Sequence, residues 1–377
     1  MVVRVNLGPR SYDICVDVPI SALGGRIAER MPHRAALVAA DGNIAHSLGG
    51  AAVASLERAG IRSELVAVPP GESSKSLEQA ARLYEECGQC GLDREGLIVA
   101  VGGGVCGDVA GFVAATYMRG VSWVQVPTTL LAQIDASVGG KVAVDHPRGK
   151  NLIGAIHQPS LVWCDIEALR TLSDRDLRAA MAEALKTGLI TNAHYYRWVR
   201  RHAEGILGRD RHVLARVVAG ACRVKAGIVA SDEKEELVGG RGPLVGPGST
   251  LGTRMVLNLG HTLGNNLEAV AGYGVMRHGE AVSVGLVAAG RVALQKGLWS
   301  KGWQRELESG LAGLHLPTRI PGLSLDELLV AMRVDKKAYG GRVRWILPVK
   351  PGVVAVRDDV TPREVSRVLV EMGASEK

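Results

Sequence analysis

The feature that most constrains the fold is an apolar segment that runs directly into a glycine-rich turn. Residues 96–101 read GLIVAV, and residues 102–108 follow as GGGVCGD. A short apolar run of this kind is typical of a strand buried on both faces, and residues 109–118 continue with helical character. Gly102, Gly104 and Gly107 match the GxGxxG pattern, in which glycines let backbone N–H groups approach a phosphate. In this context of strand, turn and helix, the segment therefore predicts a nucleotide site.

Strand-like and helix-like segments alternate through the first half of the chain. Strands are expected at residues 2–5, 34–41, 64–68, 96–101 and 121–126. Helical patterns lie between them, which is typical of a parallel α/β domain. Asp41 ends one of these strands and precedes the glycine turn, whereas the ordinary dinucleotide-binding fold places an acidic residue about 20 residues after that turn. We therefore expect an α/β nucleotide-binding domain whose parts follow a different order.

The pattern changes near residue 166 to long helical periodicity. Helices are expected at residues 174–190, 194–202, 212–231, 261–271, 279–296, 304–310 and 324–333, and a short two-strand element at 343–356. Residues 239–252 are rich in glycine and proline and predict an exposed loop. The length of 377 residues suggests two domains. We expect an α/β domain at residues 1–166 and a mainly helical, all-α domain at 167–377.

Composition and charge limit the class of ligand. The net charge is +7 and the pI about 9.2, but the basic residues are scattered and no nucleic-acid motif accompanies them. Small anionic molecules are the better match, and no nucleic-acid or membrane partner is expected. No apolar run is long enough to cross a membrane, and no signal peptide opens the chain, so we expect a cytoplasmic protein. The six cysteines are dispersed, which argues against a disulfide framework.

Residues 258–280 carry the clearest candidate for metal chemistry. Asn258, His261 and Asn265 follow at spacings of three and four, which would place them on one helical face, and His278 returns after a Gly-Tyr-Gly turn. On an earlier helix, Glu183 and Lys186 share a face. Glu183 and the two histidines would form a His2Glu site with an open fourth position, as in catalytic zinc sites. The alternative is that the histidines are exposed or hydrogen-bonded. Several glycines lie close to these histidines in the sequence. Each glycine in a helix costs about 1 kcal/mol of stability relative to alanine, so their presence indicates that another group approaches the backbone closely.

Polar residues also follow the strand at residues 121–126. Thr128 and Thr129 lie at its end, and residues 135–151 contain Asp135, Lys141 and the pair Lys150-Asn151. We interpret residues 135–151 as a polar loop. Either this loop binds an anion and hydroxyl groups of a ligand, or it is a glycine-rich loop whose charged residues are only solvated.

Five sequence blocks together closely resemble the 3-dehydroquinate synthase family. They are GGGVCGDVAGFVAATYMRG, VPTTLLAQIDASVGGKVAVDHPRGKNLIGAIHQP, MAEALKTGLI, NLGH and GYGVMRHGEAV, in the family's order, and the resemblance spans roughly residues 41–350. It implies an N-terminal α/β nucleotide-binding domain, a helical C-terminal domain and a homodimer. It also implies NAD and a divalent metal, zinc or another such as cobalt.

The resemblance assigns roles residue by residue. The metal ligands are Glu183, His261 and His278. NAD is expected to contact Asp41, Asn43, Glu72, Lys75, Gly103, Gly104, Asp108, Thr128, Thr129, Lys141, Lys150 and Thr171. The catalytic and substrate-binding set is Asp135, Lys141, Lys150, Asn151, Lys186, Lys225, Glu235, Arg254, Asn258 and Lys337 of the pair Lys336-Lys337, with Arg119 reaching across the dimer.

The implied reaction converts 3-deoxy-D-arabino-heptulosonate 7-phosphate to 3-dehydroquinate and phosphate, on the route to aromatic amino acids. It proceeds by transient NAD oxidation, phosphate elimination, re-reduction, ring opening and aldol closure. The alternatives are a related sugar phosphate cyclase, a metal-dependent polyol or glycerol-phosphate dehydrogenase, and a non-enzymatic nucleotide-binding module. A dehydrogenase would release NADH and would not need a grip on a carboxylated substrate.

The chain departs from the family pattern in two places. The family reads GHTxGH, but this chain reads GHTLGN, with Asn265 in place of a histidine that can carry a proton. Residues 237–253 form an insertion that separates Glu235 from Arg254. We expect Arg254, rather than Arg241, to hold the substrate carboxylate, because it precedes Asn258 by four residues and a guanidinium fits a carboxylate.

Overall fold

The computed structural model describes the chain except residues 32, 236–253, 273, 339–342 and 376–377, and the side chains of residues 334–338. The described chain forms two compact units. The first contains Met1–Leu172 and Arg211–Ala230, and the second contains Ser173–Asp210 and Ser231–Lys377. The expected division into domains at residues 1–166 and 167–377 stays a prediction, because close packing does not test where independently folding domains begin and end.

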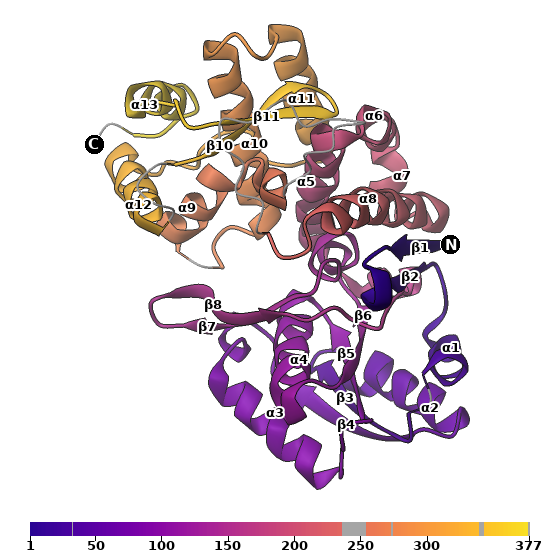
Figure 1. Cartoon of the computed structure of the whole chain (residues 1–377). Coiled ribbons are helices and arrows are strands. Elements are labelled where there is room, and N and C mark those ends of the chain that lie inside the picture. The colour runs from indigo at the N-terminus through magenta and orange to yellow at the C-terminus, as the bar shows by residue number, and fades with distance from the viewer. Residues whose placement is uncertain (32, 236–253, 273, 339–342, 376–377) are drawn as a thin grey trace. The chain divides into compact units, whose positions relative to one another are not determined.

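A seven-stranded sheet organises the described residues of the first unit (Figure 1). Its order is β1-β2-β9-β6-β5-β3-β4, and only β1 runs antiparallel to its neighbour. The strands are β1 (Val2–Val5), β2 (Tyr12–Val16), β3 (Ala35–Asp41), β4 (Arg62–Val68), β5 (Leu97–Gly102), β6 (Ser122–Pro127) and β9 (Leu161–Cys164). The predicted parallel α/β architecture is confirmed.

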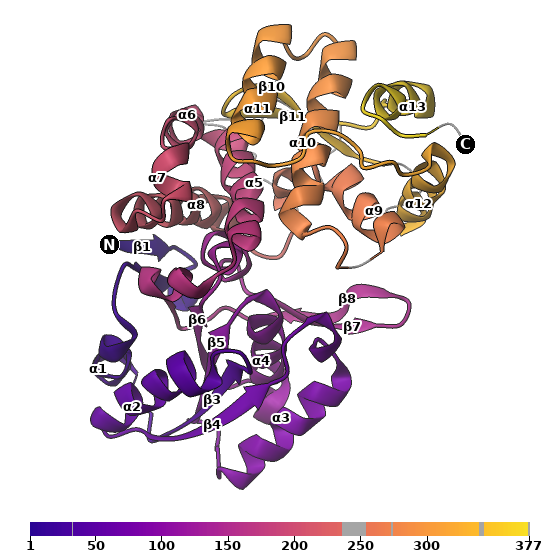
Figure 2. The same ribbon diagram turned by 180° about the vertical axis from the view of Figure 1, so that it is seen from behind.

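Apolar strands form here because the sheet is covered on both faces. In β3, Leu37 and Ala39 enter one core cluster, and Ala36 and Val38 enter the other. Helices α3 (Leu77–Gln89) and α4 (Gly104–Thr116) supply the first cluster, while α1 (Leu23–Arg30) and α2 (Gly50–Arg58) supply the second. Figures 1 and 2 show these helix pairs on opposite faces of the sheet.

The predicted polar loop at residues 135–151 is wrong for its second part. Residues Lys141–His146 (β7) and Gly149–Ile156 (β8) pair as an antiparallel hairpin. Val142 and Val144 are buried in the core cluster that includes α4, and Ala143 between them is also buried. This burial, together with pairing to β8, fixes the segment as a strand.

The second unit is mainly helical. Its helices are α5 (Asp174–Thr191), α6 (Ala193–Arg201), α7 (Ala203–Leu207), α9 (His261–Ala271), α10 (His278–Gln295), α11 (Lys301–Gly313), α12 (Leu325–Ala338) and α13 (Pro362–Glu371). Strands β10 (Trp345–Lys350) and β11 (Val353–Arg357) form the predicted two-strand element. Helix α8 (Arg211–Ser231) packs almost entirely with the first unit.

Polar caps mark the starts of several helices. The side chains of Ser173, Ser300 and Thr361 each accept a hydrogen bond from a backbone N–H in the first turn of α5, α11 and α13. None of the helices in the described ranges combines the length and apolar character that crossing a membrane requires.

Candidate active site

The three predicted metal ligands come together in the second unit. Glu183 lies in α5, and His261 and His278 are the first residues of α9 and α10. One ligand atom from each residue lies within 4.8 Å of the other two. The Nε2 atoms of both histidines are 3.6 Å from Oε1 of Glu183. The spacing-based hypothesis therefore corresponds to a real cluster of donor atoms.

Glycines bring the helices of this cluster into contact. A Cβ atom on Gly279 would lie 1.8 Å from the backbone oxygen of Ala179, one turn before Glu183 in α5. A Cβ atom on Gly285 would lie 1.9 Å from the backbone oxygen of Gly260, which adopts a left-handed φ of 81° just before α9. Because any larger residue would force these backbones apart, the glycines set the distances between the ligands.

The second ring nitrogen of each histidine is also engaged. Nδ1 of His278 lies 2.8 Å from Oε2 of Glu268, and Nδ1 of His261 lies 3.3 Å from the backbone oxygen of Leu259. Both acceptors favour the tautomer with the proton on Nδ1, which leaves Nε2 directed at Glu183. Sequence reasoning missed Glu268, although its position seven residues after His261 places both on one face of a helix.

Glu183 is the most deeply buried charged group of the cluster, with a side chain 1% exposed. It forms an ion pair with Lys186, yet neither carboxylate oxygen has a hydrogen-bond partner within the described residues. Buried carboxylate oxygens normally accept hydrogen bonds. An enclosed carboxylate with two imidazole nitrogens directed at it therefore fits a divalent cation of the zinc type.

Burial and charge set the protonation of these groups. Burial alone would raise the pKa of Glu183, but the Lys186 ammonium and His278 outweigh it and hold that pKa well below its ordinary value. Burial likewise opposes charge on His278, but the carboxylates of Glu183 and Glu268 raise its pKa to about 10. Burial and the nearby Lys186 lower the pKa of His261 to about 4. His278 must lose its proton before Nε2 can act as a ligand.

In the first unit, several of the predicted NAD residues lie at the carboxyl ends of β3, β5 and β6. A Cβ atom on Gly103 would lie 3.2 Å from Cγ2 of Thr129, and one on Gly102 would lie 3.2 Å from Cβ of Asp41. Thr128 donates its backbone N–H to the oxygen of Gly102 at 2.9 Å. Since α4 begins at Gly104, its N-terminus opens onto this turn. The backbone N–H of Asn43 is held by the carboxylate of Asp41 at 3.0 Å.

Ion pairs connect four more of the predicted NAD residues. Nζ of Lys75 lies 2.5 Å from Oδ2 of Asp108, and Nζ of Lys150 lies 3.2 Å from Oε1 of Glu72. Burial raises the pKa of Asp108 and outweighs the opposing effect of Lys75. Thr171 is exposed at the end of the short helical segment Ile166–Thr171 and makes none of these contacts.

Two of the predicted substrate residues of the first unit, Lys225 and Asp135, contact each other. Nζ of Lys225, from α8, lies 2.5 Å from the backbone oxygen of Asp135 and 2.7 Å from its carboxylate. Lys141 and Asn151 are exposed on the β7–β8 hairpin, and Asn151 has a left-handed φ of 57°. Arg119 is exposed after α4, also with a left-handed φ, of 67°.

In the second unit, one helical expectation is wrong. Asn258 ends the 3-10 turn Arg254–Asn258, and the left-handed Gly260 separates it from α9, so Asn258 does not share a helical face with His261. Arg254 is buried, and it donates its backbone N–H to Asp232 at 2.9 Å and Nη1 to the backbone oxygen of Glu233 at 2.7 Å.

The structure describes some of the other predicted residues of this unit and not the rest. Glu235 is exposed with a left-handed φ of 58°, and Asn265 is exposed on α9. Lys186 is buried against Glu183. The side chains of Lys336 and Lys337, Arg241 and the insertion at residues 237–253 lie outside the described residues.

Comparison with known proteins decides the family. Residues 65–179 match the family described as 3-dehydroquinate synthase N-terminal, and residues 180–244 and 248–338 match 3-dehydroquinate synthase C-terminal. The chain is 46% identical over 362 residues to the 3-dehydroquinate synthase of Symbiobacterium thermophilum, which covers 95% of this chain and 97% of that protein. The chain belongs to the 3-dehydroquinate synthase family. The resemblance predicted from the five sequence blocks is thereby confirmed.

Solved structures related to the 3-dehydroquinate synthase family have the same fold. The 2-epi-5-epi-valiolone synthase of Streptomyces hygroscopicus subsp. jinggangensis, solved with NAD+ and Zn2+ bound, superposes with a TM-score of 0.84 at 26% identity over 96% of each chain. A 2-deoxy-scyllo-inosose synthase superposes with a TM-score of 0.86 at 23% identity, over 99% of this chain and 100% of that one. The predicted fold class is confirmed.

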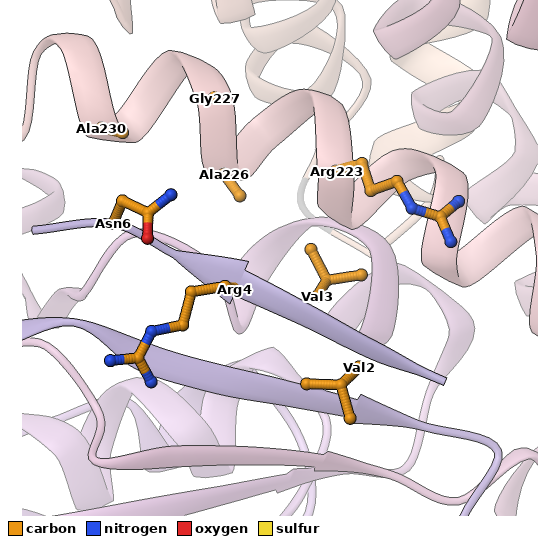
Figure 3. Close-up of a pocket in the computed structure, with 8 residues that line it drawn as sticks. All are labelled: Val2, Val3, Arg4, Asn6, Arg223, Ala226, Gly227 and Ala230. Atoms are coloured by element: carbon orange, nitrogen blue, oxygen red, sulfur yellow. The ribbon is translucent and has the colours of Figure 1, made fainter.

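A separate pocket of the first unit lies between β1 and α8 (Figure 3). Its lining combines small and apolar side chains with two arginines and Asn6: Val2, Val3, Arg4, Asn6, Arg223, Ala226, Gly227 and Ala230. Arg4 is engaged by Asp13 at 2.8 Å. Because none of the cofactor or substrate residues expected for a 3-dehydroquinate synthase lines it, this pocket is distinct from the candidate site.

Proposed function

We propose that the chain catalyses the conversion of 3-deoxy-D-arabino-heptulosonate 7-phosphate to 3-dehydroquinate and phosphate. It would act as a phosphate-eliminating carbon–oxygen lyase on the route to aromatic amino acids. The observation that carries this proposal is the 46% identity, over 95% of the chain, to a protein named 3-dehydroquinate synthase. The cluster of Glu183, His261 and His278 supports it independently.

NAD and a divalent metal, zinc or cobalt, are the cofactors of this proposal. The structural relative at 26% identity was solved with NAD+ and Zn2+. Glu183, His261 and His278 would hold the metal, because they supply one carboxylate and two imidazole nitrogens in reach of one another. When bound, the metal would polarise a substrate hydroxyl while NAD accepts and later returns a hydride.

The residues assigned to NAD divide into two groups by chemistry. Gly103, Gly104 and the N-terminus of α4 would receive the pyrophosphate through backbone N–H groups. Asp41 and Asn43 would hold hydroxyls of the adenosine ribose. Further contacts would come from side chains that flank the turn: Glu72, Lys75, Asp108, Thr128, Thr129, Lys141, Lys150 and Thr171.

The substrate would be held by charged and amide groups. Cations stabilise the charge of a departing phosphate, and such preorganised charge often contributes more to catalysis than any other single effect. Lys141, Asn258, Lys337 and Arg119 of a second subunit would have this role, and Arg254 would hold the carboxylate. Hydroxyls and the ring would be oriented by Asp135, Lys150, Asn151, Lys186, Lys225 and Glu235. The contact between Lys225 and Asp135 supports the assignment of these two as one unit.

The assembly and location follow from the same proposal. A homodimer would allow Arg119 to serve the neighbouring site, and the exposed position of Arg119 is compatible with that role. A biosynthetic enzyme acting on a sugar phosphate is expected in the cytoplasm.

A second candidate function is another sugar phosphate cyclase. Asn265 is the observation that favours it, because an amide cannot carry a proton where the family has histidine. Such an enzyme would act on a different six- or seven-carbon sugar phosphate with the same cofactors.

One assay separates these functions. The purified protein, loaded with zinc and supplied with NAD, is given 3-deoxy-D-arabino-heptulosonate 7-phosphate, and phosphate and NADH are followed together. Phosphate release with a carbocyclic product and no accumulating NADH is expected. Phosphate released only from other sugar phosphates would replace the proposal with the second candidate. Accumulation of NADH with a simple polyol would indicate a dehydrogenase.

A further inference from the structure

Glu268 is a partly buried acidic residue beside the metal-ligand cluster, and none of the assigned roles uses it. Its side chain is 14% exposed, and its Oε2 lies 2.8 Å from Nδ1 of His278. The opposite nitrogen of that ring, Nε2, lies 3.6 Å from Oε1 of Glu183. The imidazole of His278 is therefore held between carboxylates from two other helices, α5 and α9.

The two histidines are supported differently. Nδ1 of His261 faces a neutral backbone carbonyl, that of Leu259, at 3.3 Å. Nδ1 of His278 faces a carboxylate at a shorter distance. A carboxylate partner makes an imidazole a more basic ligand than a carbonyl does and restricts the rotation of the ring.

The charges of the cluster give Glu268 a second effect. The Lys186 ammonium lies against Glu183, so the charge of the one carboxylate ligand is largely balanced within the chain. Glu268 has no lysine or arginine partner within the part of the chain that the structure describes. Its negative charge would therefore offset part of the charge of a divalent cation at this cluster.

We propose that Glu268 is a positioning residue of the metal centre, which fixes the orientation and tautomer of His278 and compensates the charge of the bound metal. This inference rests on the metal site of the proposed function. Glu268 itself does not contact the metal or the substrate. Its loss therefore weakens metal binding without removing a ligand.

Glu280 provides a matched control. It is also a glutamate, in the first turn of α10 and two residues after His278, but it bonds to Arg175 at 2.7 and 2.8 Å and to the backbone N–H of Arg277 at 2.9 Å. Glu280→Gln removes a charge near the cluster and weakens a helix cap, yet leaves the contact between Glu268 and His278 in place. A general effect of lost charge or lost stability would thus appear in both variants.

The experiment measures the zinc dissociation constant by competition with a chromogenic chelator. The full chain is compared with Glu268→Gln, Glu268→Asp, Glu280→Gln and Glu183→Gln, and thermal unfolding of each zinc-free protein checks the fold. Glu268→Gln is expected to weaken zinc binding about 10- to 100-fold, the usual effect of losing such a partner. Glu268→Asp, which keeps the carboxylate, restores part of the affinity, and Glu280→Gln binds zinc like the unmodified chain.

The outcomes separate this inference from the proposed metal site. If Glu183→Gln loses zinc while Glu268→Gln binds it as tightly as the unmodified chain, the role of Glu268 is overturned and the metal site stands. An equal loss in Glu268→Gln and Glu280→Gln would also overturn it. If the unmodified chain binds no zinc, or Glu183→Gln binds it unchanged, the metal site itself is wrong.

Discussion

Buried carboxylates in the two units differ in their hydrogen bonding. In the first unit, Asp13 is 4% exposed and is bonded by Arg4 at 2.8 Å and by Arg30. In the second unit, Glu183 is more deeply buried, and its oxygens accept no hydrogen bond from any described residue. Arginine side chains hydrogen-bond to Asp13, whereas Glu183 is paired with Lys186 and has the Nε2 atoms of two histidines 3.6 Å from its Oε1. We infer that Asp13 serves stability and Glu183 serves ligand binding.

The largest expected effect is the loss of activity and metal in Glu183→Gln. Phosphate release should fall at least about a thousandfold, because an amide is a poor substitute for an anionic zinc ligand. The thermal midpoint of the zinc-free variant should be lower, because the substitution leaves the Lys186 ammonium buried without its carboxylate partner. Zinc content after dialysis and phosphate release are the measurements. If the variant retains zinc, Glu183 is not a metal ligand, and the contrast drawn with Asp13 is wrong.

Removal of the metal tests the same contrast without mutation. Dialysis against a chelator should abolish phosphate release, and added zinc should restore it. The zinc-free protein should unfold at a lower temperature, because a ligand at 100 times its Kd stabilises the folded state by about 2.7 kcal/mol. In Glu183→Gln the chelator should leave the melting temperature unchanged. A chelator effect of equal size in both proteins would place the metal elsewhere.

Asp13→Asn should have the reverse profile, with lower stability and unchanged activity. The loss is expected to be about 1–2 kcal/mol at pH 7, because two charge-assisted hydrogen bonds are weakened. Burial alone would raise the pKa of Asp13, but the hydrogen bond from Arg4 and the charge of Arg30 lower it. A lowered folded-state pKa stabilises the protein above the ordinary pKa of about 4, and this contribution is lost as pH falls further. Urea unfolding at pH 7 and pH 3.5 should therefore show the difference between the proteins shrinking in acid.

The smallest effect is expected for Asn265→His. Asn265 is exposed on α9, the helix that also carries His261 and Glu268. If the position serves the substrate phosphate, the histidine should leave kcat within about threefold of the original or raise it, because a protonated imidazole adds positive charge. Zinc affinity should not change. Steady-state phosphate release checks this, and a large loss of kcat would show that the site is built around the amide.

The sequence was informative where local pattern and tertiary environment agree. Apolar runs such as residues 96–101 predicted strands buried on both faces, and the structure places β5 inside the sheet, between β6 and β3. The motif around His261 and His278 predicted a cluster of possible ligands with Glu183, and one donor atom of each lies within 4.8 Å of the others. Glycine crowding predicted close approach, which the contacts of Gly279 and Gly285 explain.

Prediction failed where a local rule met a long-range contact. The polar residues of 141–151 suggested a loop, but burial of Val142 and Val144 in the core cluster with α4 makes the segment a hairpin. Asn258 has helical spacing from His261, but the left-handed Gly260 interrupts the chain between them, so α9 begins only at His261. The second strand, Tyr12–Val16, was not predicted, although it pairs with β9 in the sheet.

The sequence by itself determined the α/β and helical halves, the family and the residue types that can bind metal. These depend on periodicity and on motifs, which are properties of neighbouring residues. Only the tertiary structure decided that α8 packs with the first unit and that Glu268, not a nearer acid such as Glu280, supports His278. Such choices depend on how closely backbones approach one another, and the approach of Gly279 to Ala179 is fixed by packing between helices far apart in the chain.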